Sequence, residues 1–404
     1  MSWLRRYNRK APIIICIVFT ALVAGLYSIH WNPLLRGEFY IQNVLTQFGR
    51  RAKLRPDLVY LAIDRDSVQL DQFDQTEIDA SPALSLMKQG WPFSRAVYPL
   101  IFDKLIASGA KVVALDFMFP TPREGDEAFH AALDKYKSNL VIASNFAVET
   151  RGAKSGTTLQ MPSDDLIKAT SPIDNRVGYV NFWPDTDGVV RSAYYGVTPA
   201  DLYGEEEGQE TYRSLAARVL QKTGNGKLIP SPGAHRFRFA GPAGTFKPRS
   251  LCDIFDSHKW NVPEEYDGGR FFKDKIILLG PEGNFMKDVL LTPFGEMPGP
   301  EIHLNAINAA LQGEFFSETS NGMDYTLIGL AAVIAWLLSV QFPSPLLRLF
   351  LLAIALLAWL GTAFILYDYA NLSIFTFNPL LVLGSSGVFS LSWDFFVERR
   401  EKAR

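Results

Sequence analysis

The chain has 404 residues, of which 48% are hydrophobic and 20% are charged, and its formal net charge is −2. The charged share is below the ~25% of typical soluble domains, and the mean hydropathy is slightly positive at +0.05. Polar residues are therefore missing from long stretches of the chain, which excludes a soluble cytoplasmic enzyme.

Four apolar runs are long enough to cross a bilayer, which takes about 20 residues. One covers residues 11–27, and three gather near the C-terminus at residues 325–341, 349–367 and 372–393. Pro379 falls inside the last run, where we expect it to kink the helix. Residues of mixed composition separate the first run from the second, so the sequence predicts one large aqueous domain between membrane anchors.

Lysine and arginine flank the first run on its N-terminal side and the last run on its C-terminal side. Because cationic flanks stay in the cytoplasm, both termini are predicted to be cytoplasmic and the chain to be a multi-pass protein of the inner membrane. Cleavage of the first run as a signal peptide stays an alternative, since Ala21 and Ala24 follow a short apolar core. An uncleaved anchor is preferred, because the uncharged run continues to Leu35.

This topology predicts four parts of the chain. They are the N-terminus with the first span at residues 1–29, an extracytoplasmic (periplasmic or extracellular) domain at residues 30–324, three transmembrane helices at residues 325–393, and a cytoplasmic tail at residues 394–404.

The predicted outer domain has more acidic than basic residues, so nucleic acid is not expected as a partner. Cys16 lies in the first apolar run and Cys252 in the outer domain, so no disulfide is expected between them. The five histidines are scattered without the spacing of a zinc site, and we predict neither a metal nor a cofactor.

Short apolar runs alternate with stretches of helical spacing along the first part of this domain, and a further run and helix follow late in it. Such alternation predicts parallel strands joined by right-handed crossovers, and thus a doubly wound α/β fold. We expect Ser94 to cap the first of these helices. The predicted strands are residues 58–63, 111–119, 139–143 and 275–279, and the predicted helices are residues 94–108, 126–136 and 301–312.

The pattern changes between about residues 148 and 270, where glycine, proline and serine are frequent. The strand candidates at residues 178–182, 189–197 and 236–239 alternate polar and apolar residues, which favours an antiparallel extension of the mainly parallel sheet. Asp187 and Gly188 form a strong turn signal between two of them.

Polar residues follow two of the predicted parallel strands, at the edge where ligands usually bind. Asp64 and Asp116 stand at strand ends, with Asp66 and Ser67 just beyond the first. A functional interpretation is that they form a polar rim that binds a small ligand or a cation. For each residue taken alone the structural alternative is preferred, namely that Asp64 and Asp66 cap a turn and that Asp116 bonds neighbouring backbone amides.

Other candidates for the rim come from later in the chain. Asp288 follows the late strand. His303 begins the late helix and is a candidate for the rim, although an ordinary surface histidine is the preferred interpretation. Asp187 and Arg191 are candidate ligand contacts as well, although their segment lacks the further oxygen ligands of a calcium loop. A hairpin turn in which Arg191 pairs with nearby aspartates is the preferred interpretation there.

Five blocks of sequence, taken in order, resemble the type 2 CHASE domain, an extracellular sensory module of bacterial transmembrane receptors. They are LVYLAIDRDSV, GWPFSRAVYPLIFDKLIASGAKVVALDFMF, GDEAFHAAL, GYVNFWPDTDGVVRSA and FFKDKIILLGPEGNFMKDVLLTPFGEMPGPEIHLNAINAAL. The resemblance implies a receptor for an external small molecule or protein, with no catalytic activity in this region. It also implies relay through the C-terminal helices to a cytoplasmic cyclase or kinase, and a homo-oligomer is expected.

The sequence departs from the family pattern after the last span, where residues 394–404 are too few for an output domain. Either the signal passes to a partner chain, or the sequence is a fragment of a longer receptor. Two rival functions stay open, namely an extracytoplasmic enzyme with Asp64, Asp116 and Asp187 as acid or base, and a scaffold for envelope proteins.

Overall fold

The computed structural model of the chain describes residues 2–151, 154–203, 210–283 and 288–402. It divides into two compact units. We call Arg51–Phe315 the α/β unit, and Met1–Arg50 together with Phe316–Arg404 the helical unit. Residues 403–404 of the predicted tail lie outside the described residues.

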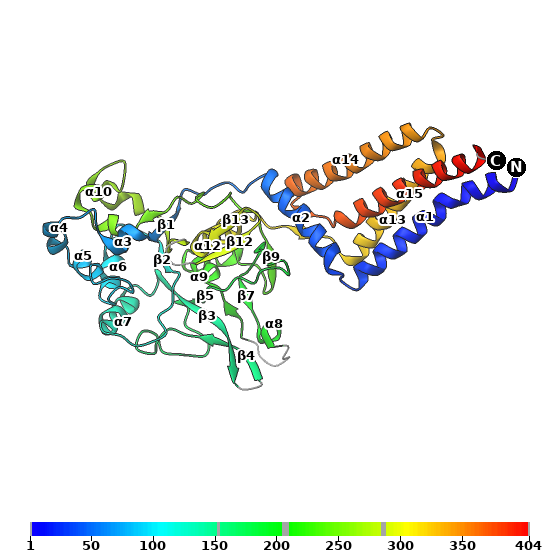
Figure 1. Cartoon of the computed structure of the whole chain (residues 1–404). Coiled ribbons are helices and arrows are strands. Elements are labelled where there is room, and N and C mark those ends of the chain that lie inside the picture. Colours follow the sequence, from blue (N-terminus) through cyan, green and yellow to red (C-terminus); the bar gives the residue numbers. More distant parts are fainter. Residues whose placement is uncertain (1, 152–153, 204–209, 284–287, 403–404) are drawn as a thin grey trace. The chain divides into compact units, whose positions relative to one another are not determined.

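The α/β unit is built on a seven-stranded sheet with the order β10-β1-β11-β2-β3-β4, in which β5 also pairs with β3 (Figure 1). All pairings are parallel except that of β3 with β4. The strands are β1 (Leu58–Ile63), β2 (Val112–Leu115), β3 (Leu140–Arg151), β4 (Lys154–Gln160), β5 (Val177–Tyr179), β10 (Arg249–Ser250) and β11 (Ile276–Pro281).

The continuous apolar runs form strands because both faces of the sheet are covered. Every residue of β1 is buried. Its odd-numbered residues pack in one hydrophobic core with α6 (Val97–Ala107) and α7 (Asp126–Lys135). Its even-numbered residues pack in a second core with α9 (Leu215–Lys222) and α12 (Gly299–Gln312). The fold is therefore of the mixed α/β class.

The predicted antiparallel extension of the main sheet is found only at β4. The segment at residues 178–182 instead supplies β5, which is parallel to β3. A Cβ at Gly178 would come within 2.8 Å of the Leu215 backbone, so α9 covers this strand closely, as in the interior of a parallel sheet. The other short strands form separate antiparallel pairs, namely β6 (Ser192–Tyr194) with β9 (Ala234–Arg236), β7 (Gly196–Val197) with β8 (Tyr212–Arg213), and β12 (Val289–Thr292) with β13 (Gly295–Pro298).

The start of α6 differs from the prediction. The helix begins at Val97 after Ala96, and the Ser94 side chain does not cap it. The Val97 amide donates to the Ser94 carbonyl, so Ser94 belongs to a separate turn before the helix. The remaining short helices of this unit are α3 (Arg65–Gln69), α4 (Gln75–Ala80), α5 (Pro82–Met87), α8 (Pro199–Tyr203), α10 (Ser257–Asn261), η1 (Gly226–Leu228), η2 (Cys252–Phe255) and η3 (Asp267–Phe272).

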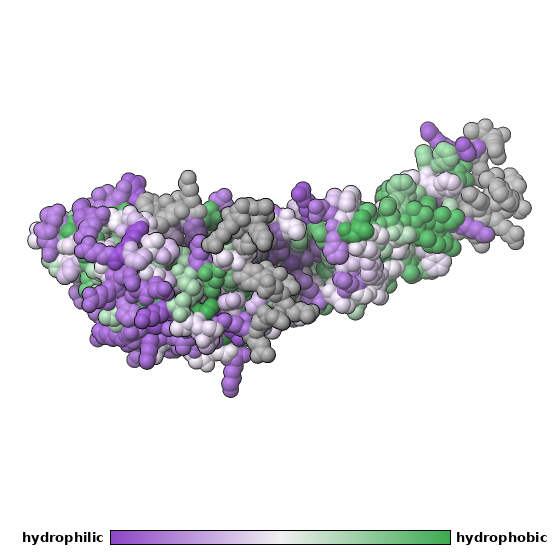
Figure 2. Space-filling model, turned by 90° about the horizontal axis from the view of Figure 1, so that it is seen from below, coloured by the Kyte–Doolittle hydropathy of each residue, from purple (hydrophilic) through white to green (hydrophobic). Residues whose placement is uncertain are grey.

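The helical unit contains four helices with stretches long and apolar enough to cross a membrane. Figure 2 shows that hydrophobic side chains (green) gather on the surface of these helices. The start of α1 and the end of α15 lie at the same end of the bundle (Figure 1). The helices of the unit are α1 (Ser2–Ser28), α2 (Asn32–Phe48), α13 (Asn321–Gln341), α14 (Pro345–Tyr369) and α15 (Phe377–Lys402).

Two features of this unit differ from the sequence prediction. The last apolar helix begins at Phe377, so Pro379 lies in its first turn, where a missing N–H costs no helical hydrogen bond. The expected kink inside the span is therefore wrong. Leu372–Ser373 forms β15 instead, paired with β14 (Ser317–Glu318). The amphipathic helix α2 was not predicted; its buried face carries Leu34, Glu38, Gln42 and Leu45.

Candidate functional site

The carboxyl ends of β1, β11 and β2 meet at one edge of the sheet, which we call the carboxyl edge. The parallel register pairs Ile63 with Pro281 and Leu115 with Leu279. Backbone hydrogen bonds extend it by one residue, because the Asp116 amide donates to Leu279 and the Glu282 amide donates to Ile63. Acidic residues far apart in sequence thus follow neighbouring strands.

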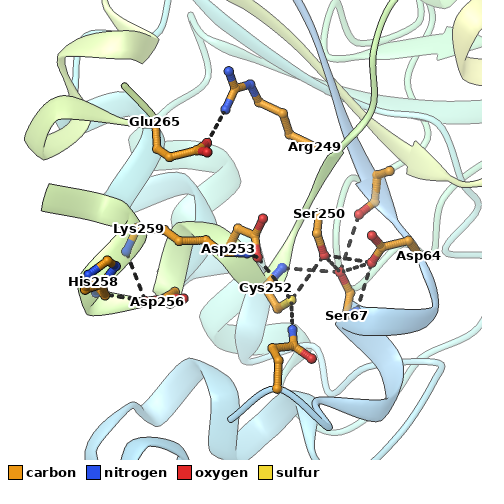
Figure 3. A network of polar contacts seen from close by, with 12 residues as sticks. Asp64, Ser67, Arg249, Ser250, Cys252, Asp253, Asp256, His258, Lys259 and Glu265 are labelled. Carbon is orange, nitrogen blue, oxygen red and sulfur yellow. Dashed lines mark hydrogen bonds and ion pairs between the residues drawn. The ribbon is translucent and has the colours of Figure 1, made fainter. Parts of the chain in front are cut away.

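Asp64 lies in a compact hydrogen-bond network that joins β1 to β10 (Figure 3). Its Oδ1 accepts hydrogen bonds from the Ser67 amide at 2.9 Å, the Ser67 hydroxyl at 2.6 Å and the Ser250 hydroxyl at 2.8 Å. Asp64 is therefore the N-cap of α3, which is the structural alternative weighed for it. Ser67 is fully buried, whereas Asp66 is exposed in the first turn of that helix.

Cys252 extends the same network. Its amide donates to the Ser67 hydroxyl at 3.2 Å, and its thiol lies 3.1 Å from the Ser250 hydroxyl (Figure 3). Burial raises the pKa of the Cys252 thiol to about 12, so the thiol is protonated near neutral pH. The network thus holds two strands together and offers no activated nucleophile.

Asp116 and His303 form a buried pair at the end of β2, two strands away from β1 in the sheet. The His303 Nε2 lies 3.7 Å from the Asp116 Oδ1, and the residues are 3% and 7% exposed. The expectation of a surface histidine is therefore wrong, because α12 is buried along most of its length. The expected bonds from Asp116 to backbone amides are also not formed; Asp116 Oδ2 has no hydrogen-bond partner among the residues that the structure describes.

Burial favours the neutral form of both members of this pair. Burial raises the pKa of the Asp116 carboxyl well above its usual range, and the charge of Asp288 raises it further. Burial also lowers the pKa of His303 to about 3. The imidazole is therefore uncharged near neutral pH, the carboxyl keeps its proton to a higher pH than an exposed aspartate does, and a cation brought close would favour release of that proton.

Asp288 and Glu282 add two more carboxyl groups to the carboxyl edge. Asp288 borders the N-terminus of α12, since a Cβ at Gly299 would come within 2.9 Å of its Oδ2. Burial raises the pKa of Asp288, and burial together with the charges of Asp64 and Asp66 raises that of Glu282. Glu282 was missed as a site residue from sequence, although its place directly after a strand was a usable signal.

Asp187 and Arg191 are engaged with each other in a turn. The Arg191 guanidinium binds Asp187 through two hydrogen bonds of 2.9 and 2.7 Å and also binds Asp185 at 2.7 Å. Gly188 has a φ of 82° and donates to the Asp185 carbonyl at 2.8 Å. The pairing of Arg191 with nearby aspartates in a turn is therefore confirmed, but the expected hairpin is wrong, because β5 before the turn pairs with β3 and β6 after it pairs with β9.

Metal coordination receives no support from the described part of the chain, in which no group of three or more histidine, cysteine, aspartate or glutamate side chains is placed to hold an ion. The carboxyl edge instead gathers protonatable groups with raised carboxyl pKa values. Such a site suits a ligand that exchanges hydrogen bonds or protons with it.

Comparison with known protein families identifies a match. The model of the CHASE2 domain matches residues 15–342, which is most of the chain and includes the whole α/β unit. No curated protein and no solved structure matches the chain.

Proposed function

The chain belongs to the CHASE2 domain family, a family of sensory input domains, and from this premise we propose that it is a transmembrane receptor whose α/β unit detects a stimulus outside the cytoplasm. The observation that carries the proposal is the extent of the match. It begins within the first candidate span and ends just after the second, so the sensory region is bracketed by helices long enough to cross a membrane.

The proposed topology places residues 30–324 outside the cytoplasm, residues 325–393 in the membrane and residues 394–404 inside. Both termini are cytoplasmic in this proposal. It is supported by the cluster of Arg399, Arg400 and Lys402 in the last turn of α15, and by the even number of candidate spans.

The proposed relay runs through the C-terminal end of α14, where Tyr367 and Asp368 lie. The Arg50 amide donates to the Asp368 carboxylate at 2.7 Å, and the Arg50 Nε donates to the Asp368 carbonyl at 3.0 Å. At the other junction between the units, the Phe316 ring stacks on Tyr367 with 4.2 Å between centroids. Both chain connections to the α/β unit are thus held by neighbouring residues of α14, which supports transmission to the C-terminal helices.

We propose that the signal then reaches a cytoplasmic cyclase or kinase, and that the receptor acts as a homo-oligomer, because a packing change in the C-terminal helices can be read by a neighbouring chain. A stimulus shifts such an equilibrium only by its different affinity for the two states. The sheet itself is proposed to be doubly wound, since helices cover both of its faces.

The proposed stimulus site is the carboxyl edge, with Asp64, Asp66, Ser67, Asp116, Asp288 and His303 as its contacts. Its support is the buried pair of Asp116 and His303 at the end of β2, at the same edge of the sheet as the exposed Asp66 after β1. Ligand contact by Asp187 and Arg191 stays a prediction.

Thiol labelling in intact cells tests the topology, because the two native cysteines are buried and give little background. Lys227→Cys places a thiol on an exposed residue of the α/β unit, and Lys402→Cys places one on an exposed residue at the end of α15. We expect a membrane-impermeant maleimide to label the first variant in intact cells and the second only after permeabilisation. Protection of the Lys227→Cys thiol until the cells are lysed would contradict the receptor.

A further inference from the structure

Four arginines are buried among the described residues, and three of them have a carboxylate partner. The pairs are Arg95 with Asp126 at 3.2 Å, Arg191 with Asp187 at 2.7 Å, and Arg238 with Glu314 at 3.2 Å. Arg218 is the exception: it is 8% exposed, and the described part of the chain places no carboxylate within 4 Å of its guanidinium. A buried charge without a counter-charge is unfavourable, and in this respect Arg218 differs from the other three buried arginines.

Neutral groups of the protein fix the Arg218 guanidinium. Its Nε donates to the Val177 carbonyl at 2.9 Å, its Nη1 to the Gln221 side chain at 3.0 Å, and its Nη2 to the Ile173 carbonyl at 3.4 Å. A guanidinium has five N–H donors, so these three bonds leave two. Burial accordingly lowers the pKa of Arg218. The Arg218 guanidinium is thus held in place and has two N–H donors left for a ligand.

Arg218 lines a pocket of about 540 Å³, which we call the Arg218 pocket, together with a second arginine, Arg213. Gly196 leaves room for that side chain, because a Cβ there would come within 3.2 Å of the Arg213 Nη1. Glu210 is the one acid among the described residues of the lining, and its Oε1 already accepts a hydrogen bond from the Ile173 amide at 3.0 Å. The pocket therefore presents two guanidinium groups against one partly engaged carboxylate.

We propose that the Arg218 pocket binds a small organic acid through its carboxylate. A carboxylate matches the fork of a guanidinium and supplies the missing counter-charge. The volume lies within the roughly 300–1,000 Å³ range of small-molecule sites, and it exceeds that of an inorganic ion. Pro172 and Ile173 supply apolar surface for the carbon skeleton of the ligand. This site is separate from the proposed carboxyl-edge site and does not depend on the membrane topology.

Binding to the full chain in detergent tests the proposal. The probes are sodium acetate, lactate, succinate, benzoate and glutamate at matched ionic strength, each compared with sodium chloride, inorganic phosphate and the corresponding neutral amide. We expect at least one acid to bind in calorimetry and to raise the Tm, while its amide does neither. Arg218→Gln and Arg213→Gln are each expected to weaken that acid at least tenfold. The control Arg270→Gln removes the same charge from an exposed arginine of the α/β unit and is expected to leave the affinity unchanged.

Three results would overturn the proposal. The first is that no acid of the panel binds, and the second is that the two pocket variants bind the acid as tightly as the parent chain does. The third is that phosphate binds as tightly as the acid, in which case the pocket holds an adventitious ion only. If Arg218→Gln does not fold, the affinity of Arg213→Gln for the acid tests the proposal instead. Arg213 lies on the two-residue strand β8, and in the described part of the chain its side chain donates no hydrogen bond that fixes the fold around Arg218. A negative result in these binding experiments would leave the receptor proposal standing, because thiol labelling tests the membrane topology and not ligand binding.

Discussion

A single protonatable residue, Asp116, dominates the chemistry of the carboxyl edge. Its unfolded carboxyl titrates near pH 4, whereas the folded carboxyl keeps its proton to higher pH because burial raises its pKa. Above about pH 4 the folded state therefore binds more protons than the unfolded state. It follows that this carboxyl lowers the free energy of unfolding as the pH rises towards its folded pKa.

Asp116→Asn removes that dependence. Relative to the parent chain, the variant is expected to gain stability as the pH rises above about 4, by up to about 1.4 kcal/mol per pH unit while the folded carboxyl is still protonated. His303 and Asp288 are present in both proteins, so the comparison isolates Asp116. Urea unfolding of the full chain at pH 4.5 and 8 measures the difference. Asp66→Asn, at an exposed residue near the same edge, is the control. If the free energy of unfolding of Asp116→Asn differs from that of the parent chain by the same amount at both pH values, the proposed role of the Asp116 proton is wrong.

Among the elements, α2 holds the start of α15 through one buried carboxylate. The Glu38 side chain is 1% exposed and accepts hydrogen bonds from the Thr376 and Phe377 amides, both at 2.8 Å. These are the unpaired N–H groups that begin a helix, where negative charge is favourable. Gly37 allows the close approach, since a Cβ there would meet the Phe377 ring at 2.5 Å.

Glu38→Ala leaves two buried amides without their acceptor. We expect it to lower the free energy of unfolding of the full chain by about 1–3 kcal/mol, because backbone donors buried without a partner are unfavourable. Thermal unfolding in detergent measures the loss. Arg36→Ala changes an exposed residue of the same helix and is expected to have little effect. Equal Tm values for the two variants would show that Glu38 does not hold α15.

At the scale of the whole molecule, the α/β unit contains its own hydrophobic cores. Both large clusters consist of residues between Arg51 and Phe315. The buried face of α2, by contrast, packs within the helical unit, where Leu45 shares a cluster with Phe316 and Tyr367. The compact unit is therefore shorter at its N-terminal side than the domain of residues 30–324 expected from the sequence.

The fragment of residues 51–315 is accordingly expected to be monodisperse without detergent and to unfold in one cooperative transition. The fragment of residues 30–324 is expected to self-associate, because it carries α2 without the helices that cover it. Size-exclusion chromatography with circular dichroism compares the two. If only the longer fragment is soluble and folded, the division of the chain is wrong.

The parts of the fold that were predictable from sequence are those with a local signal. The strand at Leu58–Ile63 and the apolar spans have continuous hydrophobic runs, which suffice to identify them. The parallel pairing of β5 and the burial of His303 depend on residues far away in sequence, because α9 covers β5, and α12, which carries His303, packs in one core with β1 and α9. The start of the last span was misplaced because the pairing of Leu372–Ser373 with Ser317–Glu318 has no local signature.

The candidate site was predictable to a similar degree. Asp64 and Asp116 were predictable because they follow the carboxyl ends of predicted strands. The raised pKa of the Asp116 carboxyl follows from burial, which a sequence does not show. Arg218 was not predicted as a site residue, because the sequence shows neither that an arginine is buried nor whether a carboxylate lies near it.

The bundle brings the first and last helices to the same end (Figure 1). A polypeptide fused to either terminus is thus delivered to one compartment, whichever way the bundle is inserted. In the proposed receptor, an output module joined to either terminus would therefore stand on the same side of the membrane.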